Sequence, residues 1–189
     1  MVQTTDIDAM LGRLRACVEP LGVTVLRAGT SAEAAAAIAA QVELSAADAA
    51  VISSEVSAVA PALTAALDAA GVAWRIPDGP EDARDEALGV SLATLAVAET
   101  GSVMLAERTL ADRAACALVR NHVTIVRTST LVPSLEEAAP ALREVALRPG
   151  GGYGTLMTGP SRTADIEMSL TVGVQGPSRV VTLFVDDLT

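Results

Sequence analysis

The chain has 189 residues with 13 basic and 23 acidic side chains, which gives a net charge of −10. Hydrophobic residues make up 51% of the sequence and charged residues 19%, a composition typical of a globular protein. The acidic balance argues against a nucleic-acid groove, which needs a basic patch, and against docking on anionic lipid. A chain of this length and composition is expected to form a single domain over residues 1–189, with a helical lead-in over about residues 1–20.

The sequence shows no sign of export or of membrane insertion. Asp6 and Asp8 lie among the first ten residues, where a secretory signal would carry positive charge. No uninterrupted apolar run reaches the length of a membrane-spanning helix. We expect a cytoplasmic protein without membrane insertion.

Helical and strand patterns alternate through the first half. Apolar residues recur at helical spacing in Thr5–Val18, and Thr30 with Glu33 forms a capping box before an alanine-rich segment. Helices are predicted over Thr5–Val18, from the Thr30 cap to Leu44, and over Val56–Ala70 and Glu81–Leu88. Strands are predicted over Val23–Leu26, Ala49–Ser53 and Val72–Ile76. This alternation indicates parallel strands with helices on the sheet faces.

The middle of the chain departs from that pattern. Leu92–Ala98 and Ser102–Ala106 are both apolar, and the turn Glu99-Thr100-Gly101 separates them. The simplest interpretation is an antiparallel hairpin in which the glycine supplies the unusual backbone angles. The predicted fold class is therefore α/β, with a mainly parallel sheet flanked by helices and an inserted hairpin.

Alternation resumes in the second half. Leu110–Val119 is predicted to be a helix or an irregular cover, and Ser134 caps a helix that reaches Leu147. The remaining predicted strands are Val123–Val126, Thr155–Met157 and Val180–Val185.

The stretch that follows Met157 is the richest in polar chemistry. A Gly-Pro-Ser-Arg-Thr turn precedes a segment, Ile166–Val172, that opens like a short helix. Free backbone N–H groups, two hydroxyls and the Arg162 guanidinium suit a carboxylate or a phosphate. The alternative is a capped helix start, with Thr163 as the N-cap and Asp165 complementing the helix dipole.

Ligands of open α/β sheets bind at the C-terminal ends of the strands, and three polar turns are expected there: Glu99–Ser102, Gly159–Thr163 and Gly173–Pro177. Glu99 is the candidate catalytic residue, because a carboxylate on a turn between apolar strands suits acid–base or nucleophilic work. Its alternative role is a solvated turn residue or an ion pair with an arginine. The candidate ligand-binding residues are Thr100, Gly101, Ser102, Gly159, Pro160, Ser161, Arg162, Thr163, Asp165, Gln175 and Gly176.

The sequence contains few residues that could bind a metal ion or cluster. Cys17 and Cys116 are far apart, and no Cys-x-x-Cys occurs, whereas an iron–sulfur cluster usually needs four thiolates. The single histidine, His122, cannot form a zinc site of ordinary spacing and is expected at the edge of a strand. We expect no cofactor and no metal on this chain.

Several of these motifs together resemble the LUD domain, and more closely the lactate utilization protein C family. They occur in the order Gly89-Val90, Ala98–Val103, Ile125-Val126, Leu131–Pro133, Gly159–Glu167 and Gly173–Pro177. One departure is Gln175, where the family commonly has His; a hydrogen-bonding role survives this exchange, whereas a titrating one is in doubt.

The resemblance implies a fold like that of ribose-5-phosphate isomerase, glucosamine-phosphate deaminase and the CoA-transferases. It also implies a role in oxidising L-lactate to pyruvate beside partner proteins that carry iron–sulfur clusters. The chain would then be an accessory or ligand-binding subunit that takes a small carboxylate or phosphorylated ligand, and whether it is catalytic alone stays open.

Two other functions remain open at this stage. Some CoA-transferases of that broad fold use a glutamate in a Glu-Asn-Gly turn, and Glu99-Thr100-Gly101 looks similar, so a stand-alone CoA-transferase or sugar-phosphate isomerase is the first alternative. The second is a non-catalytic ligand-sensing module. The apolar composition is compatible with a homo-oligomer as well as with a large core.

Overall fold

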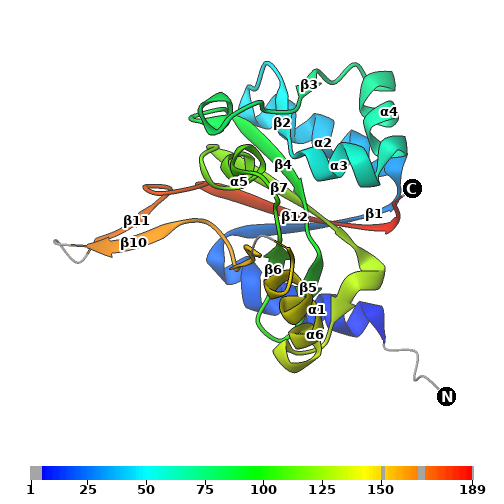
Figure 1. Ribbon diagram of the computed structural model, residues 1–189, viewed down its shortest axis with the longest axis vertical. Coiled ribbons are helices and arrows are strands. Elements are labelled where there is room, and N and C mark those ends of the chain that lie inside the picture. The colour runs from blue at the N-terminus through cyan, green and yellow to red at the C-terminus, as the bar shows by residue number, and fades with distance from the viewer. Residues whose placement is uncertain (1–5, 150–151, 166–168, 189) are drawn as a thin grey trace.

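A computed structural model describes residues 6–149, 152–165 and 169–188 (Figure 1). In this part of the chain the main sheet has the strand order β1-β12-β7-β4-β2-β3, and every neighbouring pair is parallel. Its strands are β1 (Val23–Thr30), β12 (Arg179–Asp187), β7 (Asn121–Arg127), β4 (Leu88–Leu92), β2 (Ala50–Ile52) and β3 (Trp74–Arg75). The predicted α/β class with a mainly parallel sheet flanked by helices is confirmed.

Side chains of the strands point alternately to the two faces of this sheet, and both faces are apolar. Helices cover one of these faces. Ile38, Leu63 and Leu67 from the helices pack with Val90 and Ile125 from β4 and β7. The helices of this layer are α2 (Ser31–Ser45), α3 (Ser54–Val59) and α4 (Pro61–Ala69). The predicted helix Val56–Ala70 is broken at Ala60, before the proline that opens α4.

The opposite face carries a second, smaller sheet with the order β8-β5-β6-β9. Its strands are β5 (Leu95–Val97), β6 (Ser102–Leu105), β8 (Leu131–Val132) and β9 (Thr155–Met157). Helix α1 (Ile7–Val18) packs with this layer and the main sheet, whereas α6 (Leu135–Ala146) covers the far side of the small sheet. Figure 1 shows α2, α3 and α4 on one side of the molecule, and α1 and α6 on the other.

The predicted hairpin is confirmed, but its first strand begins later than expected. Leu95 pairs with Met104 and Val97 with Ser102 in antiparallel register. Leu92 instead closes β4, where it pairs with Ile125 of the main sheet. The hairpin therefore belongs to the second sheet and is not inserted into the parallel one.

The predicted helix over Glu81–Leu88 is wrong. Only a single 3-10 turn, Pro80–Ala83, forms, and Leu88 already begins β4. The apolar alternation Leu88, Val90, Leu92 has the period of a strand, and burial against α2 and α4 favours that period over the local charge pattern. Two further 3-10 turns lie at Glu19–Leu21 and Thr128–Thr130.

Helix α5 (Leu110–Ala117) packs directly on β4 and β2. Gly89 makes this approach possible, because a Cβ atom at this position would lie 2.0 Å from the carbonyl oxygen of Ala115. The Thr109 hydroxyl caps α5 by accepting from the N–H of Asp112 at 3.0 Å. The close contact holds the C-terminal part of α5 against β4.

The polar stretch after Met157 forms a hairpin, not a turn and helix. β10 (Arg162–Asp165) pairs antiparallel with β11 (Ser169–Val172), and this arm projects from the body of the molecule (Figure 1). Thr163 lies in β10 and is therefore not an N-cap, because β-branched residues on both strands favour the extended pairing. Residues 166–168, where the predicted helix would begin, lie outside the described residues.

Within the described ranges, none of the helices is both long enough and apolar enough to cross a bilayer.

Candidate functional site

The Glu99-Thr100-Gly101-Ser102 turn is held against the body by close packing and by hydroxyl contacts. Gly101 has φ +70°, and a Cβ there would lie 2.2 Å from Cγ1 of Val18, so only glycine fits. Thr100 Oγ1 donates to Ser102 Oγ at 2.9 Å, and Ser102 Oγ lies 2.6 Å from Thr158 Oγ1. These contacts join the turn to the residue that precedes Gly159.

Glu99 itself lies at the surface. Its Oε2 accepts from the N–H of Leu135 at the start of α6 at 3.3 Å, and its Oε1 lies 3.9 Å from Nη2 of Arg13. The side chain is 44% exposed. The geometry matches the alternative role given above, a solvated turn residue near an arginine.

The other two predicted turns lie side by side. The N–H of Ser161 donates to the carbonyl of Pro177 at 3.1 Å, and the N–H of Gly173 donates to the carbonyl of Ser161 at 2.8 Å. A Cβ at Gly176 would lie 3.3 Å from that of Ser161. Arg162, however, donates from its guanidinium to the backbone carbonyl of Leu21.

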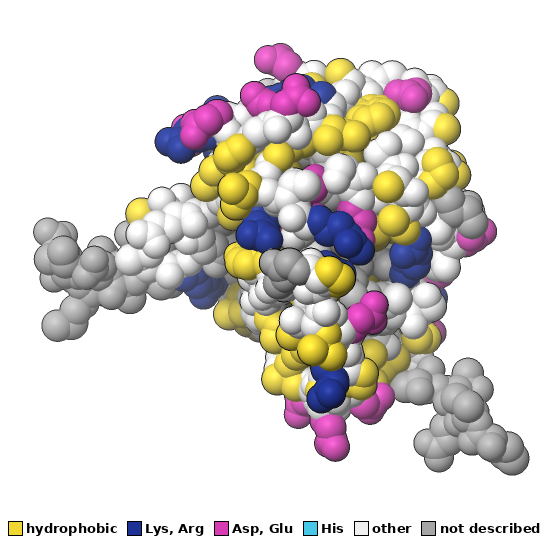
Figure 2. Space-filling model, viewed as in Figure 1, with side chains coloured by type: hydrophobic (Ala, Val, Ile, Leu, Met, Phe, Trp, Pro, Cys, Tyr) yellow, Lys and Arg dark blue, Asp and Glu magenta, His cyan; other side chains and the backbone are white. Residues whose placement is uncertain are grey.

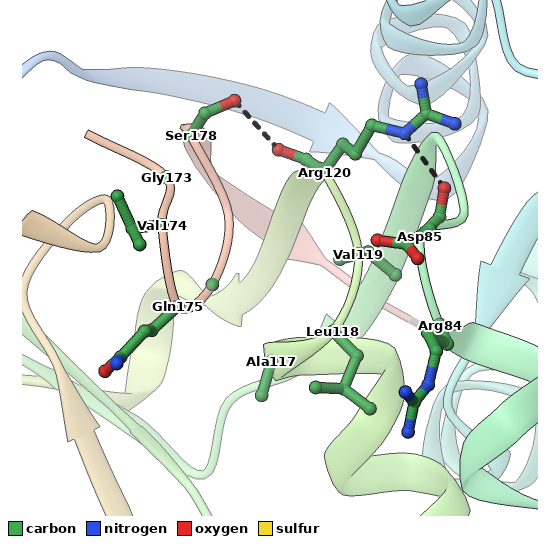
Figure 3. A pocket seen from close by; sticks show the side chains of 11 residues that line it. Arg84, Asp85, Ala117, Leu118, Val119, Arg120, Gly173, Val174, Gln175 and Ser178 are labelled. Atoms are coloured by element: carbon green, nitrogen blue, oxygen red, sulfur yellow. Dashed lines mark hydrogen bonds between the residues drawn. The ribbon is translucent and has the colours of Figure 1, made fainter. Parts of the chain in front are cut away.

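Gln175 and Gly176 line a cavity of about 590 Å³. Gln175 and Arg84 lie on opposite sides of it, and Arg120 donates from Nε to the carbonyl of Asp85 at 2.9 Å (Figure 3). The cavity lies at the N-terminal ends of β4, β7 and β12, so the expectation that all three turns meet at C-terminal ends is wrong. The turn over residues 173–177 precedes β12, whose direction follows from its parallel pairing with β7.

A different carboxyl, on Glu107, lies buried just after β6. Its side chain is 3% exposed, Oε1 accepts from the Cys116 thiol at 3.5 Å, and Oε2 has no partner among the described residues. Burial, followed by the negative charges of Asp112 and Glu55, raises the pKa of Glu107 to about 8. Glu107 therefore holds its proton at neutral pH.

The neighbouring carboxylate of Asp112 is fully engaged. It accepts from the N–H of Ser54 at 2.6 Å, from the Ser54 hydroxyl at 2.8 Å and from the Thr109 hydroxyl at 2.7 Å. The Ser53 hydroxyl lies near this carboxyl and lowers the pKa of Glu107, but among the described residues it makes no hydrogen bond of acceptable geometry. Two carboxyls in such contrasting surroundings are typical of a functional site.

Three arginines surround the buried acid. Arg113 donates from Nε to the Glu107 carbonyl at 3.4 Å, with its guanidinium carbon 4.0 Å from the ring centroid of Tyr153. Arg148 donates from Nη1 to the carbonyl of Ala106 at 2.7 Å. Arg108 borders the same space, and among the described residues none of the three arginines has an acidic partner within 4.0 Å.

Glu107 is shared by three adjoining hollows of about 280, 300 and 90 Å³. We call their union the Glu107 cavity. Figure 2 shows basic side chains gathered across the middle of this face, in an otherwise acidic protein. The cavity lies beyond the C-terminal ends of β2 in the main sheet and β6 in the small sheet. The end of β2 is the kind of strand end at which α/β sheets usually bind ligands.

A polar stripe crosses the core behind this cavity. His122 is fully buried in β7, not at a strand edge as expected, with Nε2 2.7 Å from Ser91 Oγ and Nδ1 3.3 Å from Thr124 Oγ1. Burial lowers the pKa of His122 to about 4, so the ring is neutral. Ser91 also reaches the Cys116 thiol, which connects the stripe to Glu107.

The sequence reasoning missed Glu107. The available signal was an acid placed two residues after the mainly apolar strand Ser102–Leu105 and next to Arg108. In the described part of the chain, no group of three or more His, Cys, Asp or Glu side chains has the arrangement of a metal site.

Comparison with known proteins assigns the chain to a family. The LUD domain matches residues 11–185. A lactate utilization protein C 1 from Bacillus mycoides is 36% identical over 121 residues, which cover 61% of this chain and 51% of that protein. The lactate utilization protein C of Geobacillus kaustophilus is 37% identical over 110 residues, which cover 56% and 45%. That of an Exiguobacterium species is 33% identical over 141 residues, which cover 70% and 58%. The chain thus spans about half the length of these relatives.

One solved structure has the same overall fold. The crystal structure of a DUF162 family protein from Deinococcus radiodurans matches with a TM-score of 0.67 and 21% identity. The match covers 95% of this chain and 98% of that one. At this identity the likeness shows the fold alone.

Proposed function

Because the chain belongs to the LUD domain family, we propose that it is the accessory or ligand-binding subunit of an L-lactate utilisation system. The family match over residues 11–185, with relatives named lactate utilization protein C, is the observation that carries this proposal. The system would oxidise lactate to pyruvate in the cytoplasm. The whole of residues 1–189 acts in it as one LUD domain.

The cysteines of the chain fit a division of labour with iron–sulfur partner proteins, which the family resemblance implies. A cluster usually needs four thiolates, and this sequence offers only Cys17 and Cys116, of which Cys116 is buried beside Glu107. We assign the redox step to iron–sulfur partner proteins. This chain then supplies a binding site for a small carboxylate or phosphorylated ligand.

The predicted turns offer one place for such a ligand. Gln175 and Gly176 line the cavity of about 590 Å³, together with Arg84 and Arg120. The Gln175 amide and the Arg120 guanidinium suit an anion, whereas Arg84 is paired with Glu81 at 3.0 Å and Asp85 adds a carboxylate to the same lining. The stand-alone transferase would need Glu99 as its nucleophile. That side chain is exposed and contacts the start of α6, so its geometry does not favour this alternative.

Growth and co-purification test the proposed role. Deletion of the gene should abolish growth on L-lactate as the sole carbon source while growth on glucose stays normal. The tagged protein, expressed from its own locus, should co-purify with proteins that show iron–sulfur absorption. Normal growth of the deletion strain on L-lactate would contradict the proposal.

A further inference from the structure

Glu107 is unusual because it is buried without a partner for one of its oxygens. A buried polar atom that makes no hydrogen bond costs free energy, and proteins retain such groups mainly where they serve a function. The nearby Asp112 shows the contrast, since Ser54 and Thr109 satisfy its carboxylate with three hydrogen bonds. Oε2 of Glu107 therefore lacks a hydrogen-bond partner among the described residues, with the Ser53 hydroxyl close to the carboxyl, in a residue that lines the adjoining cavity.

Among the described residues, the arginines around the cavity have no acidic side chain within ion-pair distance. Arg113 and Arg148 each donate one hydrogen bond to a backbone carbonyl of the Ala106-Glu107 segment, which holds the side chains in place. The stacking of Arg113 on Tyr153 further restricts its guanidinium. Guanidinium groups fixed in this way keep donors free, and carboxylates are their preferred partners.

The balance of charge limits what the cavity accepts. Asp112 and Glu55 lie close enough to raise the pKa of Glu107, so they also weaken the positive potential from the arginines. A monoanion fits this balance better than a phosphate or a dicarboxylate does. Hollows of about 280 and 300 Å³ admit a molecule of a few heavy atoms.

We propose that the Glu107 cavity binds a small monocarboxylate with a hydroxyl or carbonyl oxygen on the adjacent carbon. Arg113 and Arg148 hold the carboxylate, and the protonated Glu107 donates to the adjacent oxygen. The inference rests on the proposed function for its choice of L-lactate and pyruvate as probes. None of these residues is among those predicted from the sequence.

Ionisation of Glu107 should abolish this binding, because its charged form repels the ligand and cannot donate. The groups that face it are Asp112 and Cys116 from α5, Glu55 from α3, and the arginines at the mouth. Burial and the charge of Glu107 raise the pKa of the Cys116 thiol well above its ordinary value, so it stays neutral. Binding should therefore weaken as the pH rises through about 8, the pKa of Glu107.

Calorimetric titration of the purified protein with L-lactate and with pyruvate tests the proposal. Between pH 6.5 and pH 9, wild-type affinity should fall about tenfold, because only one molecule in about ten keeps the Glu107 proton one unit above its pKa. Glu107→Gln keeps a neutral donor, so its affinity should not change over this range. Arg148→Gln should weaken binding by about tenfold or more at pH 6.5.

Arg143→Gln is the matched control, since this exposed arginine on α6 lies outside the cavity. Its affinity should equal that of the wild type. No binding by the wild type, an equal pH profile in Glu107→Gln, or an equal loss in Arg143→Gln would each overturn the inference. If the calorimetric test fails but the deletion strain does not grow on L-lactate, the proposed function stands and only the cavity assignment is overturned. If the protein binds the ligand but the deletion strain grows normally, only the proposed function is contradicted.

Discussion

Replacing Glu107 by Gln should stabilise the protein at neutral and alkaline pH. The folded state keeps the Glu107 proton up to about pH 8, whereas the unfolded chain releases it near the ordinary value of 4.5. Stability from this group is fully present below pH 4.5 and is lost as the pH rises through 8. Gln is neutral in both states, so it removes the loss and keeps a similar shape.

The expected magnitude follows from the shift of the pKa. Each unit corresponds to about 1.4 kcal/mol, so the difference in unfolding free energy between variant and wild type should grow by about 3 kcal/mol from pH 4 to pH 7 and by about 4 kcal/mol from pH 4 to pH 8. Such a gain is a large fraction of the stability of a typical domain. Natural selection tolerates the loss when the group serves a ligand.

Urea denaturation followed by circular dichroism at half-unit steps from pH 4 to pH 8.5 measures this difference. Glu144→Gln is the control, because Glu144 is exposed on α6 and its variant should follow the wild-type curve. The contribution of His122 cancels, since the ring is present in every variant. Parallel curves for the wild type and Glu107→Gln would refute the reasoning.

Three further changes have clear expected outcomes. Burial lowers the pKa of His122 to about 4, so the unfolding free energy of the wild type relative to that of His122→Gln should fall by about 3 kcal/mol as the pH drops from 6.5 to 4 in the same urea assay; a constant difference would count against a buried neutral ring. Gly89→Ala should lower the unfolding free energy by about 2 kcal/mol or more, since the new Cβ meets the backbone of α5. Gly12→Ala, in open space on α1, should raise the unfolding free energy by about 0.5–1 kcal/mol. Thermal melts of both variants test this contrast, and equal effects would contradict the packing of α5 on β4. Glu99→Gln should change stability by less than about 1 kcal/mol because the side chain is 44% exposed, and a much larger loss in urea titration would show that its contacts with Arg13 and α6 matter more than their exposure indicates.

Local patterns predicted much of the fold because they act over short distances. The capped starts of α2 and α6 at Thr30 and Ser134 are visible in the sequence, and the structure has both caps. Gly101 marked the hairpin turn, because the backbone there needs a positive φ. The break before Pro61 could also be expected, although its position within the segment depends on packing.

The elements that failed are those in which distant partners overrule local preference. Leu88 looked like the end of a charged helix, but β7 pairs with it and draws the segment into the sheet. Thr163 looked like an N-cap, but its pairing with Thr171 places it in a strand. Composition around these residues does not reveal those partners.

The candidate site shows the same division. The sequence marked Glu99 and Arg162 because their neighbours are turn residues, yet one is exposed and the other donates to a backbone carbonyl. Glu107 becomes unusual only when α3 and α5 close over it and Arg148 arrives from beyond α6. Its burial is a property of the assembled fold, and no window of sequence contains it.

The most direct test is an NMR titration of the side-chain carboxyl carbon of Glu107, assigned with the Glu107→Gln variant, in the absence and presence of pyruvate. We expect a midpoint near 8 in the free protein and a higher midpoint with pyruvate, because the ligand binds only the protonated form. A midpoint near the ordinary value of 4.5, or one that pyruvate leaves unchanged, would contradict the assignment of this cavity as a carboxylate site.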